Sequence, residues 1–151
     1  MPKTKTPLTP EERLELAKRY LKNAKEVLKK SPIDKGAGVY EDLKYVSEAS
    51  GTAYLSALEA LKALFLWEGL ITAKEIKNKL KKIDMYAYYL SKTAKIGKDR
   101  DVLLKLFDSV YVILHLGGYY RELQNKKAID AGFESVEKII KIVERHINGK
   151  G

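Results

Sequence analysis

The helix-breaking residues of this chain leave long stretches uninterrupted. All four prolines lie within the first 32 of 151 residues, and glycines mark most of the later breaks. Between these breaks, apolar residues recur every three or four positions, the spacing that gathers side chains on one face of an α-helix. An all-β chain of this length would need many more closely spaced turns. We therefore expect an all-α fold, an up-and-down antiparallel bundle of about five helices.

Length and composition narrow the class further. An apolar content of 45% suits one core, so we expect a single bundle domain over residues 9–148 and disordered tails at 1–8 and 149–151. The chain has no cysteine and its start, MPKTKTPL, lacks an apolar signal segment, which predicts a cytoplasmic protein. The apolar runs at 63–67 and 110–116 are much shorter than the roughly 20 residues that cross a bilayer, so no membrane span is expected.

The formal charge of +9 has two explanations. Lysines outnumber arginines 24 to 5 and cysteine is absent, a composition typical of thermophile proteins. Clustered lysines can also bind phosphates, and the basic run over 74–82 offers Lys74, Lys77 and Lys81 as a candidate RNA-contact face. We favour the thermophile surface, with RNA contact as the alternative.

Capping and stop signals predict where the helices lie. Thr9, Pro10 and Glu12 form a capping box that starts the first helix, which stops near Pro32 and is followed by a loop to residue 40. The second helix is expected at about 41–67, and the third from a capping box at 72–75 to about 94. The fourth should run from 99 to a break at Gly117-Gly118, and the fifth from the cap Asn125 to about Ile147. The third should share one apolar face made of Ile76, Leu80, Ile83, Ala87, Leu90 and Ala94. The second helix is rich in alanine and serine, which favours tight packing against its neighbours.

The segment over residues 107–121, FDSVYVILHLGGYYR, is the most distinctive in the chain. A Gly-Gly break could fold Tyr119, Tyr120 and Arg121 back onto His115 and form an anion or ligand pocket. The alternative, which we favour, is that His115 hydrogen-bonds within the bundle and the tyrosines close the end of its core.

Motifs for several kinds of chemistry are missing from the sequence. There is no phosphate-binding loop ending in Gly-Lys-Ser/Thr and no Gly-x-Ser-x-Gly elbow. Neither His115 nor His146 has a glutamate three residues before it, which a four-helix carboxylate di-metal site would require. We therefore expect no metal and no cofactor.

Three features together resemble the HEPN-like helical superfamily: the sequence AKRYLKNA at 17–24, the Ala/Ser-rich second helix, and LHLGGYY at 114–120. The resemblance extends over about residues 17–144, and the chain is most similar to a small prokaryotic family of unknown function. It implies an up-and-down bundle, often dimeric, in a superfamily that contains RNA-cleaving toxins and non-catalytic relatives.

The catalytic members of that superfamily carry an arginine followed by a histidine after four to six residues, and this sequence departs from that motif. No arginine precedes His115 or His146 at that spacing, and Lys141 is the nearest substitute. We therefore expect a non-catalytic homodimer that binds a protein or RNA partner. The alternative is an RNA-processing or nucleotide-handling enzyme, of toxin–antitoxin type, that uses His115, Tyr120 and Arg121.

Overall fold

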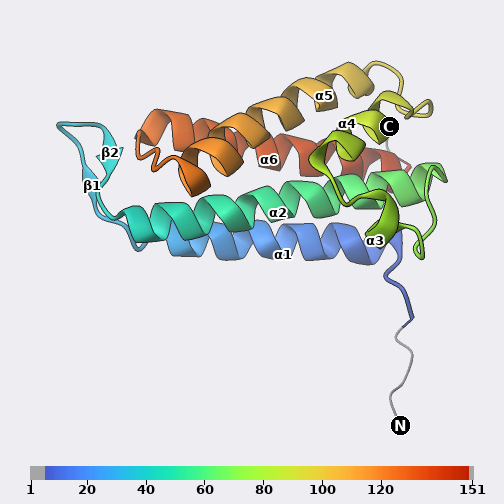
Figure 1. Ribbon diagram of the computed structural model, residues 1–151, viewed down its shortest axis with the longest axis horizontal. Helices are drawn as coiled ribbons and strands as arrows, with labels where there is room; N and C mark the ends of the chain where they lie inside the picture. Colours follow the sequence, from blue (N-terminus) through green and yellow to red (C-terminus); the bar gives the residue numbers. More distant parts are fainter. Residues whose placement is uncertain (1–5, 150–151) are drawn as a thin grey trace, which may run out of the picture.

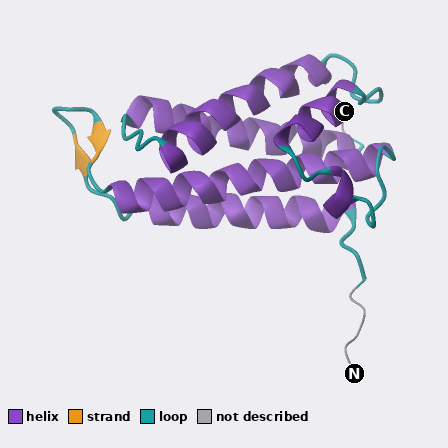
Figure 2. Ribbon diagram, viewed as in Figure 1, coloured by secondary structure: helices purple, strands orange, loops and turns teal. Residues whose placement is uncertain are grey.

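A computed structural model describes residues 6–149 of the chain (Figures 1 and 2). Within this range the long helices are α1 (Pro10–Leu28), α2 (Leu43–Glu68), α5 (Asp99–Val110) and α6 (Lys126–Ile147), and α5 continues into a π-helix, η1 (Tyr111–Tyr120). Two short helices, α3 (Ile76–Lys79) and α4 (Ile83–Ser91), lie at one end of the bundle, and a hairpin of β1 (Ile33–Asp34) and β2 (Val39–Tyr40) lies at the other. The described chain is mostly helical, which agrees with the all-α prediction.

The core lies between the long helices, and α2 contacts α1, α6 and η1. Five apolar residues of α1 recur every three or four positions, as expected for a helix of the bundle, and all five are buried: Leu14, Ala17, Leu21, Ala24 and Leu28. Small residues of α2 allow close approach, and the Ser56 hydroxyl donates a hydrogen bond of 2.6 Å to the carbonyl oxygen of Ala17. Residues 1–5 and 150–151 of the two predicted tails lie outside the described residues, and the predicted domain limits stay a prediction.

The local helix signals are largely confirmed. Thr9 and Glu12 form the reciprocal capping box of α1 with Pro10 in the first turn. The side chain of Asn125 accepts a hydrogen bond from the Ala128 amide at the start of α6. Gly69, with φ of 78°, ends α2 in the left-handed conformation that glycine adopts without strain.

The predicted third helix is wrong as one continuous element. Only half of its capping box forms, since the Thr72 amide donates to the Glu75 carboxylate at 2.9 Å, and a turn over residues 80–82 separates α3 from α4. After this turn Tyr86 is buried, while Ala87 and Ala94 of the predicted face are exposed. Burying a tyrosine ring removes far more apolar surface from water than burying alanine, so packing sets the register of α4.

The predicted Gly-Gly break is also wrong, because the helix continues through both glycines to Tyr120. Gly118 is buried against α2, and a Cβ atom at this position would lie 2.2 Å from the Ser50 hydroxyl oxygen. Gly117 is similarly crowded, since its Cβ would lie 2.9 Å from Leu123. Gly118 therefore permits the close approach of α2, while Gly117 makes room for the Leu123 side chain that follows η1, and neither acts as a hinge.

The predicted loop over 32–40 contains the hairpin. β1 and β2 pair antiparallel, Ile33 with Tyr40 and Asp34 with Val39. The Tyr40 amide donates to the Gln124 carbonyl oxygen at 2.9 Å, and the Lys126 amide donates to that of Gly38 at the same distance. The hairpin is thus attached to the segment that leads into α6.

The union of α5 and η1 gives one continuous helix, Asp99–Tyr120, which extends the helix predicted from residue 99 past both glycines. By length and composition alone it could cross a membrane, with a mean hydropathy of 1.3. Its residues Leu103, Phe107, Val110 and Leu114 are buried in the core of the bundle, while 28% of the apolar window as a whole is buried. The absence of a membrane span stays a prediction.

Replacing Gly118 with alanine should destabilise the fold, because its Cβ would meet both side-chain heavy atoms of Ser50 at under 3.0 Å. We expect a loss of about 1–3 kcal/mol of unfolding free energy in urea denaturation, the usual cost of overpacking. Gly36→Ala is the control, since its Cβ would touch only Asp34, at 3.4 Å. Adding Ser50→Gly to Gly118→Ala should recover part of the loss, and an unchanged stability of Gly118→Ala would contradict this account.

Candidate functional site

The site begins with the π-helix at the end of α5. In η1 each amide bonds five residues back, so side chains five positions apart come to the same side. This geometry places Tyr120 beside His115. Ten residues of π-helix are exceptional, because such helices usually occur as single-turn bulges, frequently at functional sites.

Four tyrosines surround the imidazole of His115, and we call these five residues the aromatic cluster. The Tyr54 ring stacks on His115 with centroids 4.3 Å apart, and Tyr111 is tilted at 5.3 Å. Tyr120 meets the imidazole edge-on at 5.0 Å, while Tyr119 lies nearly parallel to it at 6.2 Å. Such offset, stacked and edge-to-face arrangements are the favourable ones for aromatic rings.

Helix α2 positions one side of this cluster. Gly51 lies under Tyr119, and a Cβ atom on Gly51 would be 2.9 Å from that ring. Tyr54 follows on the next turn of α2 and reaches His115. The Ser47 hydroxyl also donates to the Tyr119 carbonyl oxygen at 3.4 Å. The small residues of α2 therefore make room for the rings.

Burial favours the uncharged forms of two members of the cluster, His115 and Tyr54. Desolvation lowers the pKa of His115, so the neutral imidazole is favoured. Desolvation likewise raises the pKa of Tyr54, followed by smaller effects of Tyr86 and Tyr111, so its phenol keeps its proton. A neutral imidazole between phenol rings gives no fixed positive charge for an anion.

Three of the four residues of the predicted anion pocket come together, namely His115, Tyr119 and Tyr120. Arg121 lies just beyond η1 and is exposed. Its amide donates to the Gly117 carbonyl oxygen at 3.0 Å, but its guanidinium makes no hydrogen bond or ion pair within residues 6–149. The anion pocket at these four residues stays a prediction.

The second histidine has a different environment. His146 Nε2 lies 2.7 Å from Asp99 Oδ2, which joins the end of α6 to the start of α5. The Arg145 guanidinium is 3.5 Å from the same oxygen. Lys141, the nearest substitute for the missing arginine, is exposed.

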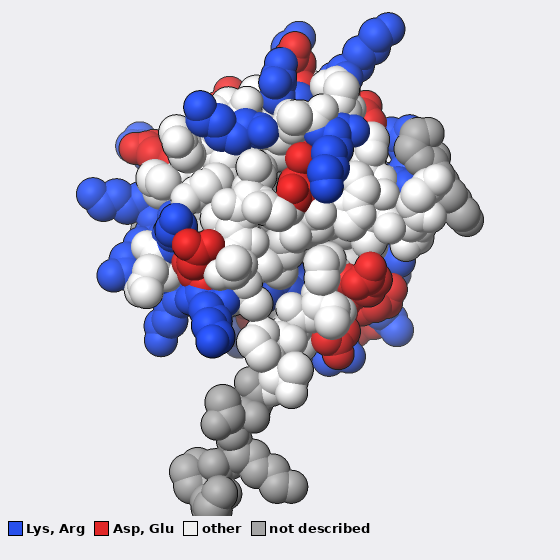
Figure 3. Space-filling model, turned by 90° about the vertical axis from the view of Figure 1, so that its right-hand side faces the viewer, with Lys and Arg blue, Asp and Glu red and all other residues white. Residues whose placement is uncertain are grey.

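The predicted basic face lies on and around α3. Lys74, Lys77 and Lys81 are all exposed and form no ion pair within the described part of the chain. Lys79, between them, pairs with Glu75 at 3.0 Å. This end of the bundle carries many lysine and arginine side chains with acidic side chains among them (Figure 3). Residues 6–149 contain no cluster of three or more histidines or carboxylates that could hold a metal ion.

The small residues of the second helix predicted tight packing, but no pattern in the sequence placed Tyr54 or Gly51 beside His115. Both are about 60 residues from His115, and no local pattern connects positions so far apart. The only signal was the run of small residues in the second helix, which indicated close approach without naming the partner.

Fold and site together define an all-α helical bundle with an aromatic cluster where the π-helix η1 packs against α2. Comparison with known families then places the chain: it belongs to the family described as a domain of unknown function, DUF5618, whose model matches residues 12–145. Its structure is similar to that of a protein of unknown function from Dyadobacter fermentans, with 34% sequence identity and a TM-score of 0.71. That match covers 92% of this chain and 98% of the other. No curated protein matches the chain.

Replacing His115 with phenylalanine should reduce the pH dependence of stability. Because the pKa of His115 is lowered in the folded state, the unfolded chain binds the proton at higher pH, and the wild type loses stability as pH falls below about 6.5. Phenylalanine keeps a ring in the stack without titrating. Urea unfolding at neutral and at mildly acidic pH should therefore show a smaller loss for the variant.

Tyr111→Phe serves as the control for this measurement. It changes a ring of the same cluster without removing the imidazole, so its loss of stability on acidification should equal that of the wild type. If His115→Phe also loses as much stability as the wild type, the imidazole is not desolvated as described.

Proposed function

We propose that this chain is a non-catalytic HEPN-like helical bundle that associates with a second copy of itself and binds a protein or RNA partner. The HEPN-like part of the proposal is supported by the resemblance at residues 17–24 and 114–120. The self-association is supported by the exposure of the aromatic cluster, which is the observation that carries the proposal.

The exposed part of the cluster is large and aromatic. Tyr119 is 48% exposed and Tyr120 64% exposed, with their ring centroids 4.9 Å apart. Leu55 lies one helical turn beyond Gly51, the residue under Tyr119, and is 48% exposed. Tyrosine is enriched at the centres of protein interfaces, where its ring is buried and its hydroxyl finds a partner. This surface suits a second protein surface better than water.

Three features support a non-catalytic role. The imidazole of His115 is stacked on Tyr54 and surrounded by three other tyrosine rings. The exposed guanidinium of Arg121 makes no hydrogen bond or ion pair in the described chain, so no contact joins it to His115 or Tyr120. His146 is engaged by Asp99.

RNA binding is supported by the basic face alone. Lys74, Lys77 and Lys81 are exposed without carboxylate partners in the described chain, and the half-exposed ring of Tyr88 belongs to the neighbouring helix α4. Lysines can neutralise phosphates while an exposed ring stacks on a base. The thermophile origin, which would also explain these lysines, and the cytoplasmic location stay predictions.

Replacing Tyr120 with lysine should weaken self-association. A charge in the proposed interface must lose its water, and we expect the dimer dissociation constant to rise at least about tenfold, which corresponds to 1.4 kcal/mol. Sedimentation equilibrium measures this constant. Tyr88→Lys is the matched control, because Tyr88 is 50% exposed but lies on α4. A wild type that is monomeric at all concentrations, or an equal effect of both variants, would refute the dimer.

Removing three charges from the basic face should weaken RNA binding. We expect the triple variant Lys74→Gln, Lys77→Gln and Lys81→Gln to bind single-stranded RNA more weakly. Its slope of log affinity against log salt should be lower by about 2, since each phosphate contact contributes about 0.7. Fluorescence anisotropy over a salt series gives both values.

The control variant carries the same loss of charge elsewhere, at the exposed Lys22, Lys138 and Lys141 of α1 and α6. It should keep nearly the wild-type affinity and slope. Equal weakening of both triple variants would indicate a response to net charge only. The absence of RNA binding by the wild type even at low salt would remove this part of the proposal.

A further inference from the structure

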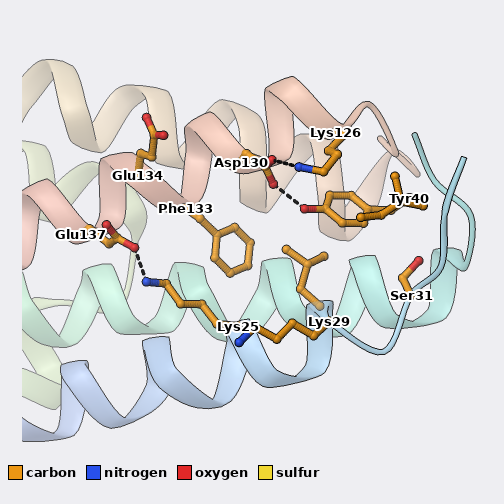
Figure 4. Close-up of a pocket in the computed structure, with 11 residues that line it drawn as sticks. Lys25, Lys29, Ser31, Tyr40, Lys126, Asp130, Phe133, Glu134 and Glu137 are labelled. Carbon is orange, nitrogen blue, oxygen red and sulfur yellow. Dashed lines mark hydrogen bonds and ion pairs between the residues drawn. The ribbon is translucent and has the colours of Figure 1, made fainter. Parts of the chain in front are cut away.

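A second candidate site lies away from the aromatic cluster and the basic face. A cleft of about 430 Å³ opens between the C-terminal part of α1, the hairpin and the N-terminal half of α6 (Figure 4). Leu28, Tyr40 and Phe133 line it with apolar and aromatic surface, and Phe133 points into it. A volume of this size is within the usual range for small-molecule sites, about 300–1,000 Å³.

The carboxylates of this cleft are already engaged or turned away. Glu137 pairs with Lys25 across the cleft, and Asp130 accepts hydrogen bonds from the Tyr40 hydroxyl and the Lys126 ammonium. Burial of the ring and the hydrogen bond with Asp130 both raise the pKa of Tyr40. Its phenol therefore keeps its proton and remains the donor of this hydrogen bond. The Glu134 carboxylate points away from the Phe133 ring (Figure 4).

Lys29 is the cation of the cleft that has no ion-pair partner within residues 6–149. Beyond the hairpin the cleft continues into a second one, which shares Ile33, Lys126 and Asp130 and adds Lys35 and Lys127. Together the two clefts are lined by five lysines and three carboxylates. The excess of positive charge comes from Lys35 and Lys127 of the second cleft, because the first is lined by three lysines and three carboxylates. In the first cleft it is the unpaired Lys29 beside the apolar floor that favours an anion with an apolar body.

We propose that this cleft binds a small aromatic anion, whose ring packs against Phe133 and Tyr40 and whose carboxylate or phosphate lies against the Lys29 ammonium. The ring of the ligand fills the cleft and packs against this largely buried apolar floor, and the anionic group supplies the partner that Lys29 lacks. The walls that α1 and α6 supply come from parts of the chain about 90 residues or more apart. The site therefore exists only in the folded protein.

The first test uses 8-anilinonaphthalene-1-sulfonate, a fluorescent aromatic anion, with the full-length protein. We expect a saturable rise in fluorescence for the wild type. Lys29→Glu should weaken binding at least about tenfold, because it replaces the attracting charge by a repelling one. Lys30→Glu is the matched control, since Lys30 is the exposed neighbour that does not line the cleft. No saturable binding by the wild type, or equal weakening by both variants, overturns the proposal.

The second test locates the ligand and identifies its charged group. Benzoate and phenyl phosphate, followed by NMR of the backbone amides, should shift the signals of Lys29, Tyr40 and Phe133, whereas benzylamine, a cation of similar shape, should not. The tighter of the two anions shows whether a carboxylate or a phosphate is preferred. Shifts confined to other parts of the molecule, or equal shifts with benzylamine, overturn the site.

Phe133→Leu tests the contribution of the aromatic floor. This variant keeps an apolar side chain of similar volume, so circular dichroism and thermal unfolding should show that it folds. We expect it to weaken binding of phenyl phosphate, because the contact between the two rings is lost. Unchanged affinity in a folded Phe133→Leu variant would contradict packing of the ligand ring on Phe133.

Discussion

The close approach of α2 and η1 is the contact on which the rest of the structure depends. Gly118 faces Ser50, and Gly51 faces the ring of Tyr119, so each helix supplies a glycine at a point of close contact. The approach buries the Ser50 hydroxyl, which has no hydrogen-bond partner among the described residues. An unsatisfied buried hydroxyl costs about 1–3 kcal/mol. Packing of the aromatic cluster must offset this cost, and so the two helices and the rings depend on one another.

Local signals predicted those parts of the fold that local energies control. The caps at Thr9 and Asn125 and the apolar stripes of α1 and α6 require only neighbouring residues, and all of them are present. The boundary between α3 and α4 and the π-helix were not predictable in this way. Both depend on contacts with α2. For example, the ring of Phe65 in α2 packs against the ring of Tyr86 in α4, with 6.3 Å between the ring centroids. A pattern in the sequence indicates which side chains are buried, but it does not indicate which residues they pack against.

The same division applies to the candidate sites. A cluster of His115, Tyr119 and Tyr120 was the less favoured of two expectations, and it depended on a break at the two glycines. Helical geometry brings the three rings together. The expected route, a break at the glycines, was wrong, since the i to i+5 spacing of η1 achieves the contact. The cleft beside Phe133 was not expected at all. Its walls meet through long-range contacts such as Lys25 with Glu137, which are 112 positions apart and leave no local signal.

The two candidate sites share a structural support in the short segment between η1 and α6. The Leu123 amide donates to the Gly117 carbonyl oxygen at 3.0 Å, and Gln124 accepts from the Tyr40 amide at 2.9 Å. Glu122, with φ of 58°, adopts the left-handed conformation. This conformation costs a residue with a side chain about 1–2 kcal/mol. It lets the chain turn just before Leu123 and Gln124, which make these two bonds. The end of η1 is therefore linked to Tyr40 of the cleft through Glu122, Leu123 and Gln124. Because this segment continues directly from η1, the approach of α2 and η1 positions the cleft as well as the aromatic cluster.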